Sequence, residues 1–267
     1  MFLKNKNIFL FIPILFLNFL FFTSFILLFI QTVNSDVNIY YEILKNEAFY
    51  DSLLYGLTIS FFTIVYSLFF YFILYYLLFL LKFKYSKDIK KYFFFLSIPL
   101  LIPYSFCALL FFILFFPVGV FQDIFPFLVG TSTAVVIAYV YKIISFFLLV
   151  SFPNLLKIKN EQINLHKMYS ENPFHFFWNI VVKRDLKFLY IAIFVVFAYI
   201  LNAYEIPSIL GSNRDKMPAV YVSELLGEFG VNSLNIAYAT SFVYFLVTLC
   251  CIPIFLIFYK ISKKVLF

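Results

Sequence analysis

The sequence predicts an all-α integral membrane protein with six transmembrane helices and both termini in the cytoplasm. Two observations predict this class: the composition, and a series of apolar runs separated by charged loops. Of the 267 residues, 64% are hydrophobic and 12% are charged, whereas soluble domains have about 45–50% apolar and about 25% charged residues. A soluble globule could not bury this much apolar surface, so lipid must form part of the solvent.

Six apolar runs are each expected to form a membrane-spanning helix. A helix needs about 20 apolar residues to cross a hydrocarbon core of about 30 Å, and an open strand cannot cross because its backbone polar groups would stay unpaired in lipid. The predicted helices cover residues 8–30, 53–81, 93–116, 133–156, 188–210 and 234–259. We expect one membrane domain to fill residues 1–267.

The first run follows two lysines, as the apolar part of a signal peptide would. It is longer than such a segment and has no small-residue cleavage site after it. We therefore expect residues 8–30 to be an uncleaved anchor.

The charged residues between the runs predict the orientation. The segments after the second, fourth and sixth runs are rich in lysine, and those after the first, third and fifth are acidic or nearly uncharged. Basic loops stay on the cytoplasmic side of a membrane. We therefore expect the loop of residues 157–187 and both termini to lie on the cytoplasmic side of a cell (inner) membrane. The net charge of +7 is thus interpreted as a topology signal, and no nucleic-acid partner is expected.

Few residues suit metal binding or catalysis at membrane depth. The three cysteines fall inside apolar runs without metal-ligand spacing, and both histidines, His166 and His175, lie in the cytosolic loop. An intramembrane enzyme, one alternative, would need a nucleophile–base pair or metal ligands inside the bilayer. We expect no enzymatic activity, no metal and no cofactor.

The cytosolic loop of residues 157–187 is expected to contain two short helices. Pro173 disfavours helix at the residue before it, so the loop should break there. After the break, apolar residues recur at the spacing of one helical face: Phe174, Phe177, Trp178 and Val181. This pattern fits a docking element for a cytosolic partner or, alternatively, a helix at the headgroup boundary with Trp178 as its anchor.

Lys142 and the segment after Glu205 are candidates for a path across the membrane. Lys142 lies about 13 Å into its helix at about 1.5 Å per residue, and a charge at that depth usually faces a bundle interior or a cavity. Glu205 is at the outer end of the fifth run, where Pro207 and Gly211 are expected to interrupt the helix. The alternatives are a structural ion pair for Lys142 and an ordinary helix end at Glu205.

The cytosolic loop resembles that of permease subunits of bacterial ATP-binding-cassette importers of the binding-protein-dependent type (type I importers). Such permeases carry Glu-Ala-Ala, three residues, Gly, then nine further residues, and then Ile-x-Leu-Pro. Aligning Ile180 on that isoleucine keeps the spacing, although the signature residues are replaced. The ATPase-coupling residues implied by this resemblance are Asn164, Leu165, His166, Ser170 and Pro173.

Three further stretches are similar to permeases of the polyamine, thiamine, sulfate and ferric-iron importer group. Residues 203–211 resemble their Glu-x-Pro-x-x-Leu-Gly stretch, and residues 97–103 match a Leu-Pro-x-x-x-Pro segment. Residues 139–146 resemble Tyr-Val-Trp-Lys-x-x-Pro-Phe, with Ser145 in place of the proline. The matches occur in the expected order across nearly the whole chain after the first run.

The resemblance implies a permease subunit that forms a solute path by alternating access. The implied partners are a pair of cytosolic ATPases, a second permease subunit and an extracytoplasmic solute-binding protein. The chain has no Gly-rich phosphate-binding loop of its own, so ATP hydrolysis is expected on the partners. A structural membrane subunit that has lost transport is the alternative, because the signature residues of the coupling loop are replaced. The solute and the identity of the second permease stay open.

Overall fold

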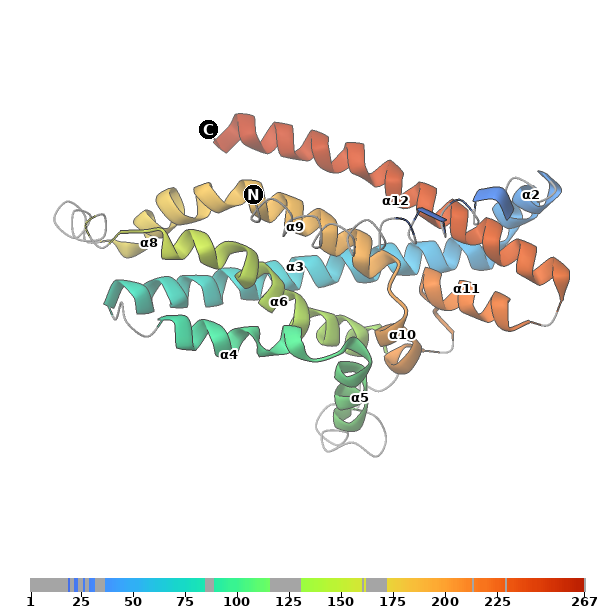
Figure 1. The fold of residues 1–267 in the computed structure, drawn as a ribbon, viewed down its shortest axis with the longest axis horizontal. Helices are drawn as coiled ribbons and strands as arrows, with labels where there is room; N and C mark the ends of the chain where they lie inside the picture. Colours follow the sequence, from blue (N-terminus) through green and yellow to red (C-terminus); the bar gives the residue numbers. More distant parts are fainter. Residues whose placement is uncertain are drawn as a thin grey trace, which may run out of the picture.

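The computed structural model describes residues 37–84, 89–115, 131–159, 172–212, 214–228 and 230–266, with a few single positions between residues 19 and 31 and at 161. Every regular element in these ranges is helical (Figure 1). The long helices that lie side by side are α3 (Glu47–Lys84), α6 (Ser132–Leu156), α9 (Lys183–Leu201) and α12 (Val231–Leu266). Shorter helices flank them: α2 (Val37–Lys45) packs on α12, and α11 (Pro218–Gly227) packs on α3 and α12.

Within the part of the chain that the structure describes, three helices are long and apolar enough to cross a membrane: Glu47–Lys82, Ser132–Leu156 and Ser233–Ile257. They contain or closely match the predicted runs 53–81, 133–156 and 234–259, so the prediction of an all-helical membrane protein is confirmed in this coarser form. A bent pair of helices would provide a fourth span. The run 8–30 lies almost wholly outside the described residues, and the count of six spans stays a prediction.

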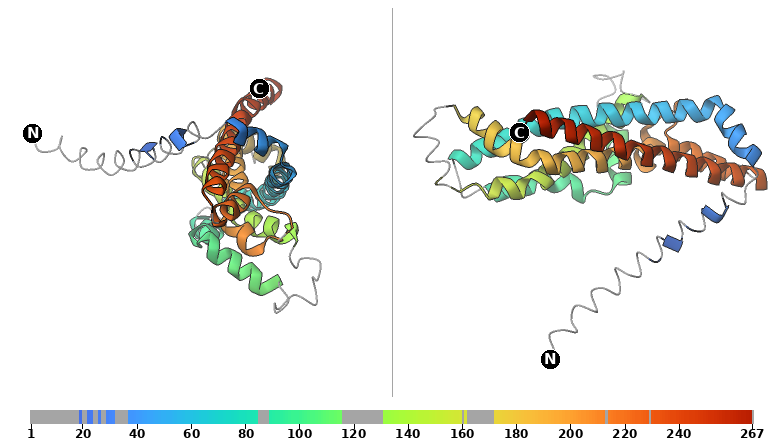
Figure 2. Two further views of the ribbon diagram at one scale, coloured as in Figure 1. Left: turned by 90° about the vertical axis from the view of Figure 1, so that its right-hand side faces the viewer. Right: turned by 90° about the horizontal axis from the view of Figure 1, so that it is seen from above.

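The predicted helix of residues 93–116 is wrong as one continuous element. It consists of α4 (Ile89–Leu101) and α5 (Tyr104–Phe115), which meet at a bend of 90°, and α5 turns away from the long helices (Figure 1, Figure 2). The cause is Pro103, which has no N–H to continue the helical hydrogen bonds and restricts the backbone of the residue before it.

A second break separates α9 from α10 (Glu205–Leu210). We expected Pro207 to interrupt this helix, but the chain leaves the helix earlier, at residues 202–204. Pro207 lies buried in the first turn of α10, where a backbone N–H would have no helical partner in any case. Gly211 follows α10, and a Cβ there would overlap the carbonyl oxygen of Pro207, so this close approach requires glycine.

The end of the loop that is predicted to be cytosolic is helical from Pro173 onward, as the break at that proline predicts. Asn172 caps α8 (Pro173–Phe176) by accepting a hydrogen bond from the N–H of Phe174 at 3.0 Å. A π-helical turn, η2 (Phe177–Val182), then leads into α9. This wider winding buries Phe177 and leaves Trp178 exposed, so the four apolar residues predicted to share one face are divided.

Candidate functional site

Two helix breaks, α4–α5 and α9–α10, lie together on one side of the bundle. The short helix α10 packs against both α5 and α6 (Figure 1). Each break releases backbone groups that a continuous helix would pair internally. Since lipid offers no hydrogen bonds, such groups must be covered by protein or water. The side chains around this junction are therefore the first candidates for function.

Lys142 reaches the first of these breaks from α6. Its side chain is 1% exposed, and its ammonium group donates a hydrogen bond to the carbonyl of Ile102, the residue at the bend. Nζ also lies 4.0 Å from the centroid of the Tyr104 ring, within the range of a cation–π interaction. Among the described residues no carboxylate forms an ion pair with Lys142, so its direct partners are a backbone dipole and an aromatic ring.

Ser145 makes a similar contact one turn further along α6. Its hydroxyl donates to the carbonyl of Leu96 in α4 at 2.6 Å. Helix α6 thus supplies two buried donors, Lys142 and Ser145, to the backbone of the broken helix. Ser145 stands where the resembled permeases have a proline, a residue that could not make this side-chain contact.

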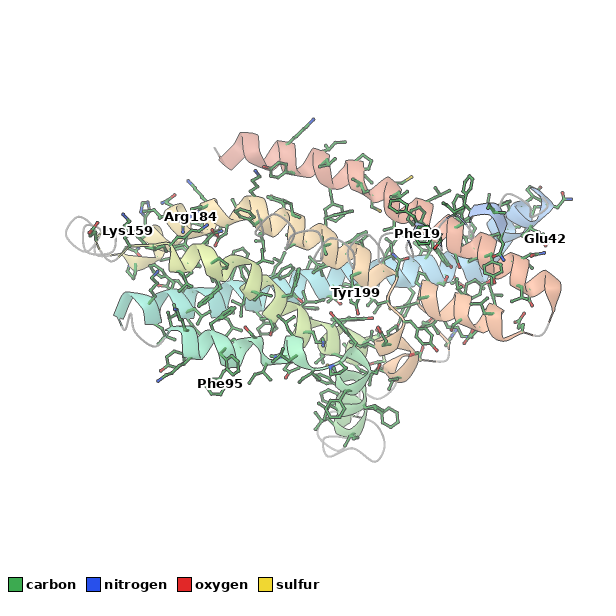
Figure 3. The ribbon with its side chains drawn as sticks, viewed as in Figure 1. Phe19, Glu42, Phe95, Lys159, Arg184 and Tyr199 are labelled. Carbon is green, nitrogen blue, oxygen red and sulfur yellow. The ribbon has the colours of Figure 1, made fainter. Side chains whose placement is uncertain are left out.

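Two tyrosines connect Lys142 with Glu205. The rings of Tyr104 in α5 and Tyr199 in α9 lie 5.0 Å apart, and the side chain of Tyr199 is close enough to interact with both Tyr104 and Glu205. Figure 3 labels Tyr199 where α9 approaches α10. A polar chain therefore runs from Glu205 through Tyr199 and Tyr104 to the ammonium group of Lys142.

Tyr139 adds an unused polar group to this region. Its side chain is 0% exposed, and its hydroxyl has no hydrogen-bond partner among the described residues. It lies close enough to Tyr104, Tyr199 and Glu205 to interact with them electrostatically. A buried hydroxyl without a partner costs about 1–3 kcal/mol, so this donor is available for water or a solute.

We refer to Lys142, Glu205, Tyr104, Tyr139 and Tyr199 as the junction cluster. The structure brings the predicted residues Lys142 and Glu205 together in it. Pro207 and Gly211 instead shape α10 beside it. The three tyrosines were missed from the sequence because 21 tyrosines are spread over the chain, and only their position at the breaks distinguishes these.

The predicted ATPase-coupling residues Asn164, Leu165, His166 and Ser170 lie outside the described residues. Pro173 is described and begins α8.

A cavity of about 1020 Å³ opens at the end of the bundle that is predicted to be extracytoplasmic. It is lined by the N-terminal half of α3, the start of α6, and residues in and flanking α11. Both signs of charge surround it, including the ion pair of Lys216 with Glu224 at 2.5 Å.

Known proteins give no family for this chain: it matches no protein-family model, and no curated protein is significantly similar to it. Within the described ranges no group of three or more His, Cys, Asp or Glu side chains could hold a metal ion. The chemistry of the junction cluster must therefore be judged from its geometry: one cation, one carboxylate and three phenols around two broken helices.

Proposed function

We propose that the chain is the transmembrane permease subunit of an ATP-binding-cassette importer and that its solute passes the junction cluster by alternating access. The observation that carries the proposal is the burial of Lys142 on the broken end of α4. Ionisable groups inside a membrane are costly and commonly mark solute or ion pathways. Broken helices at membrane depth are likewise typical of transporter binding sites.

The two breaks also provide hinges for alternating access. Hinges are short segments at the ends of helices that absorb large backbone changes, and residues 102–103 and 202–204 have this position. The contacts that cross the junction are single hydrogen bonds and ring contacts, which can separate and form again. Movement of α5 and α10 relative to α6 would expose or bury the hydroxyl of Tyr139.

The proposal includes the partners and arrangement implied by the resemblance. These are six spans in a type I importer fold in the cell (inner) membrane, a second permease subunit, and a pair of ATPases on the loop of residues 157–187. An extracytoplasmic solute-binding protein would deliver solute toward the cavity near α11. ATP hydrolysis would take place on the ATPases, and this chain would not be an enzyme.

A structural membrane subunit without transport is the second candidate. One observation favours it: the ammonium group of Lys142 already has the Ile102 carbonyl as its acceptor, as a purely structural cap would. The two candidates differ in whether the junction changes during an ATPase cycle.

A cysteine-labelling experiment distinguishes them. The full chain is purified with its co-purifying partners from its native membrane, with the three native cysteines replaced, and reconstituted in liposomes. A Tyr199→Cys variant should react with a water-soluble maleimide at a rate that changes when ATP and vanadate are added. Ile191→Cys, an exposed position two turns earlier on α9, is the control and should keep one rate. Absence of vanadate-sensitive ATP hydrolysis, or an unchanging rate at position 199, would contradict the permease proposal.

A further inference from the structure

A second buried polar centre lies around Asp185 at the predicted cytosolic end of the bundle. The Asp185 side chain is 1% exposed, and both of its oxygens accept hydrogen bonds. The hydroxyl of Tyr75 in α3 donates to Oδ2, and Nδ2 of Asn154 in α6 donates to Oδ1 at 2.6 Å. One carboxylate in α9 thus joins three long helices.

Two basic side chains close the end of α6 beside this carboxylate. The guanidinium group of Arg184, which Figure 3 labels, donates to the main-chain carbonyl of Asn154. The ammonium group of Lys82 donates to the carbonyls of Leu155 and Leu156, the latter at 3.1 Å. The last carbonyls of a helix have no helical partner, and cations are favourable there. Side chains of α3 and α9 therefore hold the C-terminus of α6.

Asp185 precedes the predicted span of residues 188–210. Burial raises the pKa of its carboxyl above the usual range, and the hydrogen bonds from Tyr75 and Asn154 act in the opposite direction. These two donors are what a carboxylate needs at a site that excludes water.

The two ends of the cytosolic loop meet at this centre. Asn154 lies just before the loop of residues 157–187, and Asp185 lies near its end. Their side-chain hydrogen bond joins positions 31 residues apart. A force on the loop therefore acts on α6 and α9 together, because this hydrogen bond joins the two ends of the loop.

We infer that Asp185 is the positioning residue of a clamp, formed with Asn154, Tyr75, Arg184 and Lys82, that makes α6 and α9 move together with α3 when the cytosolic loop is displaced. The inference rests on the proposed function for the source of that displacement, a cytosolic ATPase. Helix α6 then carries the movement to Lys142, which lies 12 residues before Asn154, or about 18 Å at about 1.5 Å per residue.

Tyr75 connects the clamp to the interior of the membrane. Its ring stacks on that of Tyr71 with centroids 5.3 Å apart, and Tyr71 is hydrogen-bonded to Ser151 of α6 at 2.7 Å. The side chains of Tyr71, Tyr75 and Ser151 are all buried. The hydrogen bond of Tyr75 with Asp185 is thus continued toward the interior of α3 and α6 by the stacked Tyr71 and its hydrogen bond with Ser151.

An exchange of the two side chains tests the clamp. Spin labels are attached through Leu156→Cys and Phe188→Cys, two exposed positions on α6 and α9, in the full chain without its native cysteines and in lipid nanodiscs. Pulsed dipolar spectroscopy then measures the spread of distances between the loop ends. Asn154→Asp places two carboxylates face to face, and Asp185→Leu removes both acceptors, so each should broaden the distribution. The double variant Asn154→Asp with Asp185→Asn restores an amide–carboxylate pair and should narrow it again.

A variant at the opposite end of the bundle serves as the control. Glu224→Leu breaks the ion pair at the opposite end of the bundle and should leave the distribution unchanged. The clamp would be overturned if the single variants gave distance distributions as narrow as that of the wild type. It would also be overturned if the distribution of the double variant were as broad as those of the single variants. If a single variant fails to fold, Tyr75→Phe removes one hydroxyl only and should still broaden the distribution, and an unchanged width would count against the clamp.

The function of the clamp has its own measurement. In the reconstituted complex, the Asn154→Asp variant should retain vanadate-sensitive ATP hydrolysis. Adding ATP and vanadate should, however, no longer change the rate of maleimide labelling at position 199. The double variant Asn154→Asp with Asp185→Asn should recover that change in rate. Labelling that still responds in Asn154→Asp would refute the positioning role. If the spin labels show the clamp but no ATPase co-purifies with the chain, only the proposed function would be refuted.

Discussion

The ammonium group of Lys142 and the carbonyl of Ile102 are hydrogen-bonded although they lie 40 residues apart in the chain. The carbonyl is not used within a helix because α4 ends at Leu101, two residues before Pro103. The ammonium group is desolvated in the middle of α6 and needs an acceptor. Each group thus satisfies the other, and the bend of α4–α5 depends on a residue of another helix.

Replacing Lys142 by Leu should leave a chain that inserts but does not transport. The variant leaves the Ile102 carbonyl unpaired, a loss of about 1–3 kcal/mol for a buried acceptor, so the melting temperature in detergent should fall. Vanadate-sensitive ATP hydrolysis in the reconstituted complex should no longer alter labelling at position 199. Lys90→Leu, an exposed lysine of α4, is the control. Unchanged melting and labelling would show that Lys142 is dispensable.

Tyr139 and Tyr199 should respond differently to the loss of their hydroxyls. Tyr199→Phe breaks the link between Glu205 and Tyr104 and should lower the free energy of unfolding by about 0.5–1.5 kcal/mol. Tyr139→Phe removes a hydroxyl to which no described residue is hydrogen-bonded, so stability should be unchanged or higher. If that hydroxyl serves the solute, transport should nevertheless fall. Thermal melting of the two variants compares them directly, and a large destabilisation in Tyr139→Phe would mean that its hydroxyl is bonded in the membrane.

Gly56 should tolerate no side chain, because α3 and α11 touch there. A Cβ at Gly56 would lie 2.7 Å from Cδ of Pro218 and 3.1 Å from Cδ1 of Leu201. Overpacking of this kind typically costs about 1–3 kcal/mol, so Gly56→Ala should lower the melting temperature. Gly227→Ala is a matched control, since its Cβ would meet no atom within 4 Å. Equal melting of both variants would show that α11 moves aside easily.

Reporter fusions test the predicted topology. Fusions at Lys87, Lys167 and Lys263 should report the cytoplasm, because basic segments stay inside. Fusions at Glu42, Asp123 and Asp215 should report the outside. An external signal at Lys167 would contradict both the orientation and the docking of an ATPase on this loop.

The sequence by itself determined where α3, α6 and α12 lie, but not that the predicted helix of residues 188–210 ends at Leu201. Apolar runs of this length must be helical in lipid whatever their neighbours are, and the runs 53–81, 133–156 and 234–259 therefore predicted α3, α6 and α12 closely. The depth of Lys142 followed from the same count of residues. Pro103 was visible within the third run, but whether a proline kinks, bends or ends a helix depends on what replaces the lost hydrogen bonds.

Only the tertiary structure decided which polar groups meet. Asp185 reads as one more loop charge in the sequence, yet it is buried against Tyr75, 110 residues away. Lys142, for which an ion pair was an alternative, has a backbone carbonyl and a ring as its direct partners instead. The physical reason is that hydrophobicity acts on each segment separately. The partners of a buried polar group, in contrast, are set by the way distant helices pack, and a single sequence does not record that packing.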